Sequence, residues 1–350
     1  MRTVLPVLLA CGLYGCSSGG SAPVRDAVAY SYEDFGAPID LKGEILPLDS
    51  IWKPERIGFR DSLLILTESS DDYFVHVYHG EKGYAVARNI PYGIGPDERL
   101  NCWSLQFGAK NVWAFDMQTG MMTEYPAPDF FVRSDVRPSR TVRLHAGATG
   151  AVALPDGRLV ASVLPDMENL LTVYDSAGQK DSSVHVPYPE LNGAVPDSWL
   201  AKRLFEYRIG YHEKCDRIVL FYVFTDLIEV YDSSLRRLAR IQGPDHFSPE
   251  LGKWEMDGIK QIAPVRQTKF AYVYGGSLTE TEIWTLYHGA PPEKGNERQN
   301  RVLVFDYAGK PLRIYRLNCL ISLFCVDETG STLYGLSEQP EPCVIRFKIL

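Results

Sequence analysis

The sequence predicts an all-β fold, a six-bladed β-propeller of four-stranded antiparallel blades, on three observations. A pair of short apolar runs separated by a turn recurs six times along the 350 residues. The second run of a pair usually ends in an aromatic residue. In LLTVYD, LIEVYD and RVLVFD an aspartate comes directly after it. The pairs recur roughly every 50 residues, the length of a four-stranded unit that cannot bury its own faces and must stack on its neighbours.

The two runs of each pair are expected to be the second and third strands of a blade. Tight turns such as Pro155-Asp156-Gly157 precede most first runs, and residues of this kind close hairpins. The first runs begin at Ser62, Asn111, Arg158, Arg217, Lys269 and Thr332, and the second runs at Phe74, Met122, Leu170, Leu227, Arg301 and Cys343.

The innermost and outermost strands are then assigned around these pairs. Innermost strands are predicted at residues 55–59, 101–107, 147–154, 204–211, 258–265 and 319–326. Outer strands are predicted in five blades, at residues 84–89, 141–145, 183–187, 235–242 and 312–317. The sixth blade ends with the chain after its third strand, and residues 41–46 (LKGEIL) are free to complete it. This N-terminal strand would close the ring, remove an exposed sheet edge and give a propeller over residues 39–350.

The amino-acid composition and the net charge limit the classes of function that are expected. Hydrophobic residues make up 45% of the chain and aromatic residues 12%, enough for large cores between blades. Of the 36 basic residues only Arg2 lies in the first fifteen, so the remaining chain carries 35 basic against 44 acidic residues, a net charge of −9. Nucleic-acid surfaces need clustered Lys and Arg, so nucleic acid is not an expected partner.

Residues 1–15 have the features of a lipoprotein signal peptide. Arg2 supplies a positive charge, and residues 4–15 form an apolar run too short to span a bilayer. The run ends in Leu13-Tyr14-Gly15-Cys16, which resembles the lipobox of bacterial lipoproteins; Leu8-Leu9-Ala10-Cys11 is a second match, and an ordinary secretory signal is the alternative. We expect lipidation at Cys16, a flexible tether over residues 16–38 and a membrane anchor in the cell envelope. The outer membrane is the expected site, with the periplasmic or surface side left open.

The whole chain after Cys16 resembles the TolB-like six-bladed propeller lipoproteins of Gram-negative bacteria. The resemblance is carried by the lipobox-like segment, the Trp52-Lys53-Pro54 lead into blade one, the DSLLIL and FVHVY hairpin, and the turn Gly93-Ile94-Gly95-Pro96-Asp97-Glu98 between blades one and two. It implies the propeller fold and membrane anchoring. It implies no reaction, because the role of the family is largely undefined.

No motif in the chain predicts catalysis, a metal or a cofactor. Gly93–Glu98 lacks the lysine and the following helix of a phosphate-binding loop. His76 and His79 are three apart in a strand and therefore face opposite sides. Acidic residues near the predicted inner strands leave one alternative open, a propeller enzyme acting on a sugar or lactone at the central channel: Asp97, Glu98, Glu206, Glu255 and Asp257.

Basic and aromatic residues are also predicted near the channel, and they favour binding over chemistry. Guanidinium and ammonium groups beside aromatic rings can grip an anionic ligand, although pairing with blade carboxylates is the simpler account. The candidate ligand-binding residues are Arg56, Arg99, Trp103, Tyr207, Arg208 and Lys260.

The long connections of the propeller are predicted to share one face, here called the long-loop face. They span residues 90–100, 188–203, 243–257 and 276–300, and the last contains Trp284, Tyr287 and His288 as expected recognition side chains. A lid packed over the blade is the alternative for these three residues. Because long loops in compact domains are usually functional or disordered, the predicted function is a non-catalytic module that binds a protein or small-molecule ligand through this face.

Overall fold

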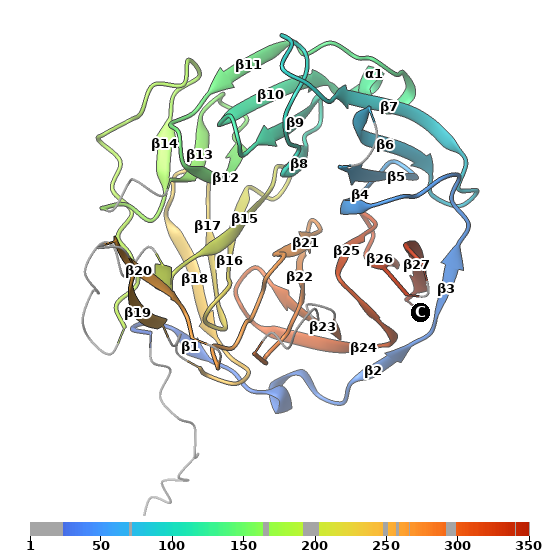
Figure 1. Ribbon diagram of the computed structural model, residues 1–350. Coiled ribbons are helices and arrows are strands. Elements are labelled where there is room, and N and C mark those ends of the chain that lie inside the picture. The colour runs from blue at the N-terminus through green and yellow to red at the C-terminus, as the bar shows by residue number, and fades with distance from the viewer. Residues whose placement is uncertain are drawn as a thin grey trace, which may run out of the picture.

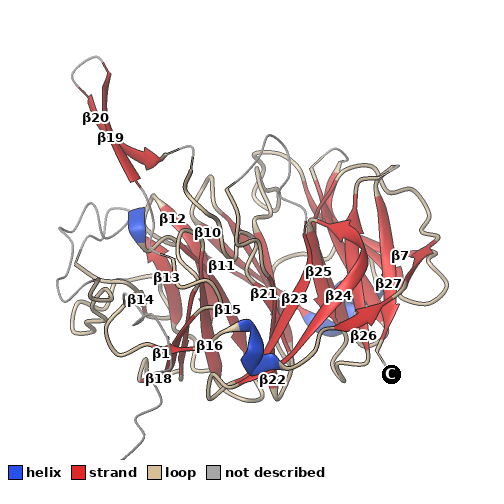
Figure 2. Cartoon of the chain, turned by 90° about the horizontal axis from the view of Figure 1, so that it is seen from below, coloured by secondary structure: helices blue, strands red, loops and turns tan. Residues whose placement is uncertain are grey.

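The computed structural model describes residues 24–69, 72–163, 168–191, 203–247, 251–256, 259–265, 267–291, 299–339 and 341–349. Six of its seven sheets are arranged radially around one axis (Figure 1), which confirms the six-bladed propeller, and the seventh is the two-stranded β19–β20 hairpin. Seen edge-on, the molecule is a disc with the β19–β20 hairpin standing out from one side (Figure 2). None of the helices in the described part has the length and apolarity needed to cross a bilayer.

The first three blades follow the chain from the axis outward. Blade one contains β4 (Pro54–Arg60), β5 (Leu63–Glu68), β6 (Tyr73–His79) and β7 (Ala85–Pro91). Blade two contains β8 (Ser104–Phe107), β9 (Asn111–Asp116), β10 (Met121–Pro126) and β11 (Arg140–Arg143), with α1 (Ala127–Val132) before its last strand. Blade three contains β12 (Ala148–Ala153), β13 (Leu159–Val163) and β14 (Thr172–Tyr174).

The outer strand predicted at residues 183–187 of blade three does not form. The chain still runs beside the blade, because the Leu170 amide donates to the Val186 carbonyl at 2.7 Å and the Asp181 amide to the Val173 carbonyl at 2.9 Å. Pro187 and Pro189 have no amide hydrogen to continue a ladder, which accounts for the irregular edge.

The last three blades complete the ring. Blade four contains β15 (Tyr207–His212), β16 (Arg217–Tyr222), β17 (Leu227–Tyr231) and β18 (Arg237–Gln242). Blade five contains β21 (Gly276–Leu278), β22 (Glu282–Leu286), β23 (Gln299–Asp306) and β24 (Pro311–Ile321), and blade six contains β25 (Leu323–Val326), β26 (Thr332–Ser337) and β27 (Cys343–Lys348).

The predicted strand assignment of blade five is wrong. Residues 258–265 were expected innermost, yet β19 (Leu251–Met256) and β20 (Ile259–Pro264) pair only with each other among the described strands. The apolar run at 269–275 was expected as the second strand, but its backbone lies between the end of blade four and residues 288–290: the Ala271 amide donates to the Val223 carbonyl at 2.8 Å, and the Ala271 carbonyl accepts the His288 amide at 3.1 Å. The innermost strand is β21, and the second is β22, inside the segment predicted as a long loop.

The N-terminal segment forms a belt around blades four, five and six (Figure 1). β1 (Val28–Ala29) adds a parallel strand to β18, and β2 (Ile39–Leu41) adds one to β24. β3 (Gly43–Leu46) pairs antiparallel with β27, so the predicted closure of blade six by an N-terminal strand is present. Residues 24–38 are therefore not a tether, because they pack on the propeller: Val24, Tyr30 and Phe35 are buried.

The recurring aspartate after the third strand has a structural cause. Asp175, Asp232 and Asp306 each accept backbone amide hydrogens of the following turn through Oδ1, for example from Gln179 at 2.8 Å and Arg236 at 3.0 Å. Such side chains replace the missing strand ladder at a tight turn. The repeated motif therefore specifies hairpins.

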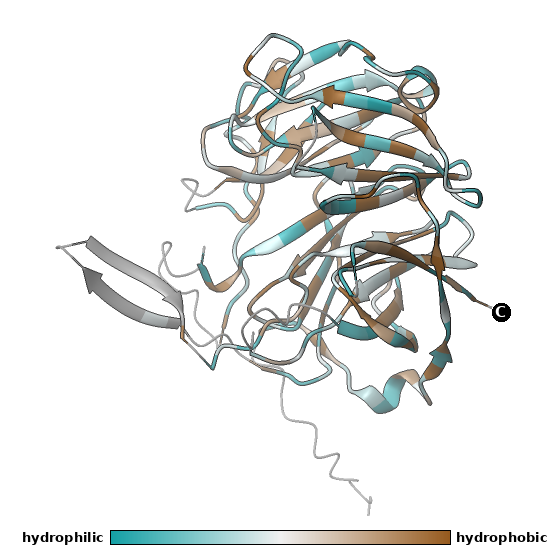
Figure 3. Cartoon of the chain, turned by 45° about the vertical axis from the view of Figure 1, so that its right-hand side comes forward, coloured by the Kyte–Doolittle hydropathy of each residue, from teal (hydrophilic) through white to brown (hydrophobic). Residues whose placement is uncertain are grey.

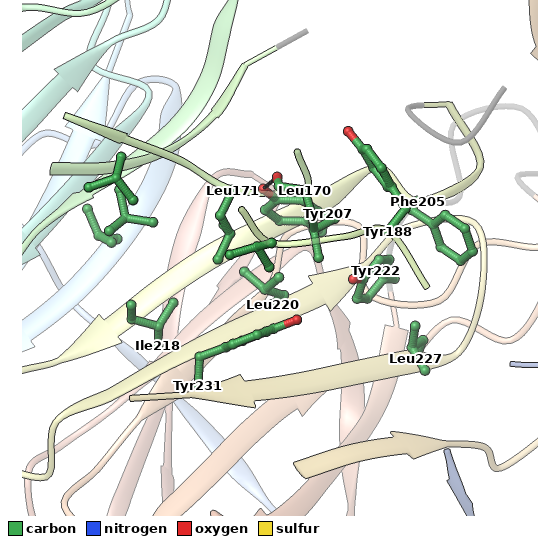
Figure 4. Close-up of a cluster of buried hydrophobic side chains, with 14 of the residues drawn as sticks. Leu170, Leu171, Tyr188, Phe205, Tyr207, Ile218, Leu220, Tyr222, Leu227 and Tyr231 are labelled. Atoms are coloured by element: carbon green, nitrogen blue, oxygen red, sulfur yellow. Dashed lines mark hydrogen bonds between the residues drawn. The ribbon is translucent and has the colours of Figure 1, made fainter. Parts of the chain in front are cut away.

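The core lies between the blades, where hydrophobic residues recur along the strands (Figure 3). Figure 4 shows the cluster between blades three and four, in which Leu170, Tyr207, Leu220 and Tyr222 are buried together. Similar clusters join the other neighbouring blades, so each blade is stabilised mainly by its neighbours.

Candidate ligand-binding site

The innermost strands surround a central cavity of about 320 Å³. β4, β8, β12, β15, β21 and β25 each contact the next strand around the ring, and the ring closes between β25 and β4. Each of these six strands is the first strand of its blade. All six therefore begin on the same face of the propeller, the face on which the chain enters from the preceding blade. This is the long-loop face, which also carries the connection with the β19–β20 hairpin (Figure 2).

Two arginines and one tryptophan gather at the mouth of this cavity on the long-loop face. Arg56 lies near the start of β4, Trp103 directly precedes β8, and Arg208 lies near the start of β15. The guanidinium carbon of Arg56 is 4.4 Å from the centroid of the Trp103 ring, and that of Arg208 is 5.9 Å from it. The structure therefore brings together three of the predicted residues, from blades one, two and four.

Backbone carbonyls hold both arginine side chains in place. Arg56 donates from Nε to the Trp103 carbonyl at 3.0 Å and from Nη1 to the Glu55 carbonyl at 2.6 Å. Arg208 donates from Nε to the Val273 carbonyl at 2.8 Å and from Nη1 to the Glu206 carboxylate at 3.1 Å. Within the described residues neither Nη2 group has a hydrogen-bond partner, so each guanidinium keeps one donor edge for a ligand.

The charge at this mouth is only partly compensated. Arg208 forms an ion pair with Glu206, whereas among the described residues no carboxylate lies within ion-pair distance of Arg56. Burial lowers the pKa of Arg56, and the nearby positive charge of Arg208 lowers it further. The site thus holds two like charges close together, an arrangement that an anion would stabilise.

Arg99 and Tyr207 do not contribute side-chain groups to this mouth, contrary to the prediction. Arg99 is buried and donates to Thr123 Oγ1 at 2.7 and 2.9 Å, to Thr141 Oγ1 and to backbone carbonyls, so it fixes the turn at residues 93–99 on blade two. Tyr207 borders the cavity, but its hydroxyl donates to the Leu170 carbonyl at 2.6 Å inside the blade core.

Trp284, Tyr287 and His288 are not exposed recognition side chains, so this prediction is wrong. All three are buried. Trp284 lies in β22 and stacks on Tyr315 at 5.4 Å between ring centroids, and Tyr287 donates to the Asp245 carboxylate at 2.8 Å. The polar run TETE before them closes the β21–β22 hairpin, and the apolar run that follows enters the core.

The other predicted residues either do not join the site or lie outside the described residues. Lys260 is in β20, outside the innermost ring, and its side chain is not described; Cys16 lies outside the described residues. Glu98 accepts the Gly95 amide in its own turn at 2.7 Å, and Asp97 lies near the exposed Arg137. In the described ranges no three His, Cys, Asp or Glu side chains are grouped to hold a metal.

Below the mouth, apolar residues that the sequence did not single out line the cavity. They come from the innermost strands and are partly buried, for example Phe107, Ile209 and Leu278. Alternation along a strand shows which residues share a face, but it does not show which strand edge faces the axis. This part of the site could be identified only from the tertiary structure.

Comparisons with known proteins agree with this architecture. The TolB-like 6-blade propeller-like family matches residues 39–329. The chain is similar in structure to a Bacteroides fragilis protein for which export has been proposed. The TM-score is 0.54 and the sequence identity 13%, and the match covers 93% of this chain and 99% of that one. A member of the DUF4221 family from Bacteroides vulgatus has a TM-score of 0.54, 11% identity and coverage of 88% and 97%. A comparison with curated proteins finds no match. With five sixths of its length matched, and six blades around one axis, the chain belongs to the TolB-like six-bladed propeller family.

Proposed function

We propose that this protein is an exported, lipid-anchored and non-catalytic binding module that holds an anionic ligand at the channel mouth of its long-loop face. The observation that carries the proposal is the cluster of Arg56, Trp103 and Arg208 around one end of the central cavity. The cavity volume lies at the lower end of the range typical of small-molecule sites.

The chemistry of the cluster favours a ligand with an acidic group. An anion between the two guanidinium groups would accept charge-assisted hydrogen bonds from their remaining Nη2 edges and reduce the repulsion between Arg56 and Arg208. The Trp103 ring offers an apolar surface beside that group, where a planar part of the ligand would stack. Carbonyl contacts already orient both arginines, so little side-chain entropy would be lost on binding.

Benzoate is a suitable first probe, because it combines a carboxylate with a planar ring. We expect titration calorimetry to detect benzoate binding to the native protein and no binding of benzyl alcohol. Arg56→Met and Arg208→Met should each weaken benzoate binding at least about tenfold, the loss of one charge-assisted hydrogen bond. Arg137→Met, at an exposed arginine that does not line the cavity, is the matched control and should bind benzoate like the native protein. Equal benzoate affinity in all variants would refute the site.

The membrane anchor is the second part of the proposal. Its support is the lipobox-like Leu13–Cys16 sequence, together with the family assignment. The belt reaches the propeller at Val24, so residues 16–23 could span at most about 29 Å between a lipidated Cys16 and blade four. The propeller would therefore stay close to the membrane, with its rim at the anchor.

Acyl labelling in cells tests the anchor. Cys16→Ala should abolish labelling and release the protein from the membrane fraction, whereas Cys11→Ala should leave both unchanged. Labelling that survives Cys16→Ala and disappears in Cys11→Ala would assign the acceptor to the other cysteine.

A further inference from the structure

The central cavity has a charged mouth, and apolar side chains alternate with polar ones along its wall. Beyond the Arg56–Trp103–Arg208 mouth, its wall is built from partly buried hydrophobic side chains of different blades: Phe59, Leu105, Phe107, Ile209, Leu278 and Leu323. These side chains offer an apolar chain a surface to pack against inside the cavity.

Glycines in the innermost strands allow this wall to pack closely. A Cβ atom at position 58 would lie 2.5 Å from the Phe107 ring, and one at position 210 would lie 3.3 Å from Leu278. The missing side chains let neighbouring hydrophobic groups lie flat against the strands that surround the axis. These close contacts give the wall an apolar part, beside polar lining residues such as Gln106 and Thr149.

The far end of the cavity carries an arginine that is paired with a carboxylate. Arg60 donates from Nε to Asp61 at 2.9 Å and from Nη1 to the Gly108 carbonyl at 3.0 Å, and the Asp61 amide donates to Glu328 at 2.8 Å. The mouth is different, because Arg56 has no carboxylate partner among the described residues. Of the described arginines that line the cavity, Arg56 at the mouth is therefore the one without a carboxylate partner.

We propose that the ligand class of this site is a single-chain anionic amphiphile, with its acidic head between Arg56 and Arg208 and its apolar chain along the channel. This inference rests on the proposed function and makes it more specific. Five residues of β4, from Arg56 to Arg60, line the cavity wall and extend about 16 Å, long enough to accompany a medium-length alkyl chain. A carboxylate and a phosphate ester share the required head chemistry.

A chain-length series separates this inference from the proposed function. Titration calorimetry with butanoate, octanoate and dodecanoate, below their micelle-forming concentrations, should show affinity rising up to about fourfold for each buried CH₂. Octanoate should bind at least about 100-fold more tightly than butanoate. Octanol and octylamine should bind at least tenfold more weakly than octanoate, because they lack the anionic head. Octyl phosphate, compared with octanoate, identifies which head is preferred.

Two sets of variants assign the head and the chain. Arg56→Met and Arg208→Met should weaken octanoate and benzoate alike, whereas Leu278→Ala should weaken octanoate at least about fivefold and leave benzoate unchanged. Ile209→Ala provides a second chain variant if Leu278→Ala unfolds, and Arg137→Met remains the control. If benzoate binds but octanoate binds no more tightly than butanoate, the amphiphile inference fails and the anion site stands. Octanol binding as tightly as octanoate would also overturn the inference, and loss of binding for all acids would overturn both proposals.

Discussion

At the scale of single residues, blade four contains a buried charge network. The Glu229 carboxylate is fully buried and accepts hydrogen bonds from Arg240 Nε at 2.5 Å, Tyr222 at 2.5 Å and Tyr231 at 3.1 Å. Arg240 also donates to the carbonyl of Arg25 in the belt, at 2.9 Å. A buried carboxylate and guanidinium are tolerated only as a fully bonded set, because either charge alone would be unsolvated.

Breaking this network should destabilise the protein strongly. Arg240→Ala would leave the buried Glu229 charge with only Arg237, at 3.8 Å, as a basic partner among the described residues, and we expect the free energy of unfolding to fall by about 3–5 kcal/mol in urea unfolding. Arg346→Ala is the control. The ion pair of Arg346 with Glu44 on β3 is exposed at the carboxylate, so it should contribute little to the free energy of unfolding. Similar losses in the two variants would contradict the role given to burial.

Asp226 makes the stability of this region depend on pH. Its buried carboxylate accepts the amides of Asp245 at 2.9 Å and His246 at 2.7 Å, and burial raises its pKa from 3.8 to about 6. Because the folded-state pKa is above the unfolded value, the stabilising contribution is full below pH 3.8 and is lost as pH rises through about 6. Asp226→Asn removes this titration.

Urea unfolding of both proteins between pH 4.5 and 7 measures the effect. The native protein should lose about 2 kcal/mol more than Asp226→Asn over this interval, apart from the titrations that both share. Parallel pH profiles would show that Asp226 does not titrate in this range.

At the scale of elements, β3 is the strand that completes blade six, and its neighbouring residues point to opposite sides. Leu46 pairs with Val344 and is buried with Leu64, Leu66 and Leu336, whereas Ile45 is 62% exposed. Leu46→Ala should lower the free energy of unfolding by about 2–5 kcal/mol because it leaves a cavity between blades six and one. Ile45→Ala should change it by less than about 0.5 kcal/mol. Thermal unfolding distinguishes the two variants. A larger effect of Ile45→Ala would show that the register of β3 against β27 is different from the one described.

At the scale of the whole molecule, the N-terminal belt joins three blades that would otherwise have open outer edges. Tyr30 packs edge-to-face on Phe305 at 5.1 Å between ring centroids, Arg25 pairs with Glu190 at 2.8 Å, and the Arg316 side chain pairs with Asp40. Two of its three strands run parallel to their neighbours, so they add to complete blades. The belt therefore covers edges and links blades that are far apart in the chain.

Stepwise removal of the belt tests its contribution. Proteins that begin at residues 24, 38 and 50 should melt at successively lower temperatures, since the second loses β1 with Tyr30 and Phe35 and the third also loses β2 and β3. The shortest protein should aggregate, because it exposes the edge of β27. Thermal unfolding with light scattering measures both effects. Equal melting temperatures for the proteins that begin at 24 and 38 would show that the belt contributes nothing to stability.

Much of this architecture could be predicted from the sequence because it depends on local patterns. Alternating apolar runs and the Asp-capped turns after third strands reflect interactions within a single hairpin, and the roughly fifty-residue period reflects a single blade. Blade five was misassigned because its polar TETE turn resembles a loop and its preceding apolar run lies between the end of blade four and residues 288–290. Periodicity does not show which neighbour an apolar run will pair with.

The sequence by itself determined the number of blades, the closure by a strand within residues 41–46 and the arginine–tryptophan composition of the channel mouth. Tertiary structure alone decided which predicted residues meet there. Arg56, Trp103 and Arg208 converge from three blades, while Arg99 folds back onto Thr123 and Trp284 enters a core. The physical reason is that blade hairpins are specified by contacts close in sequence, whereas the channel and its belt are built from contacts between strands as far apart as β3 and β27.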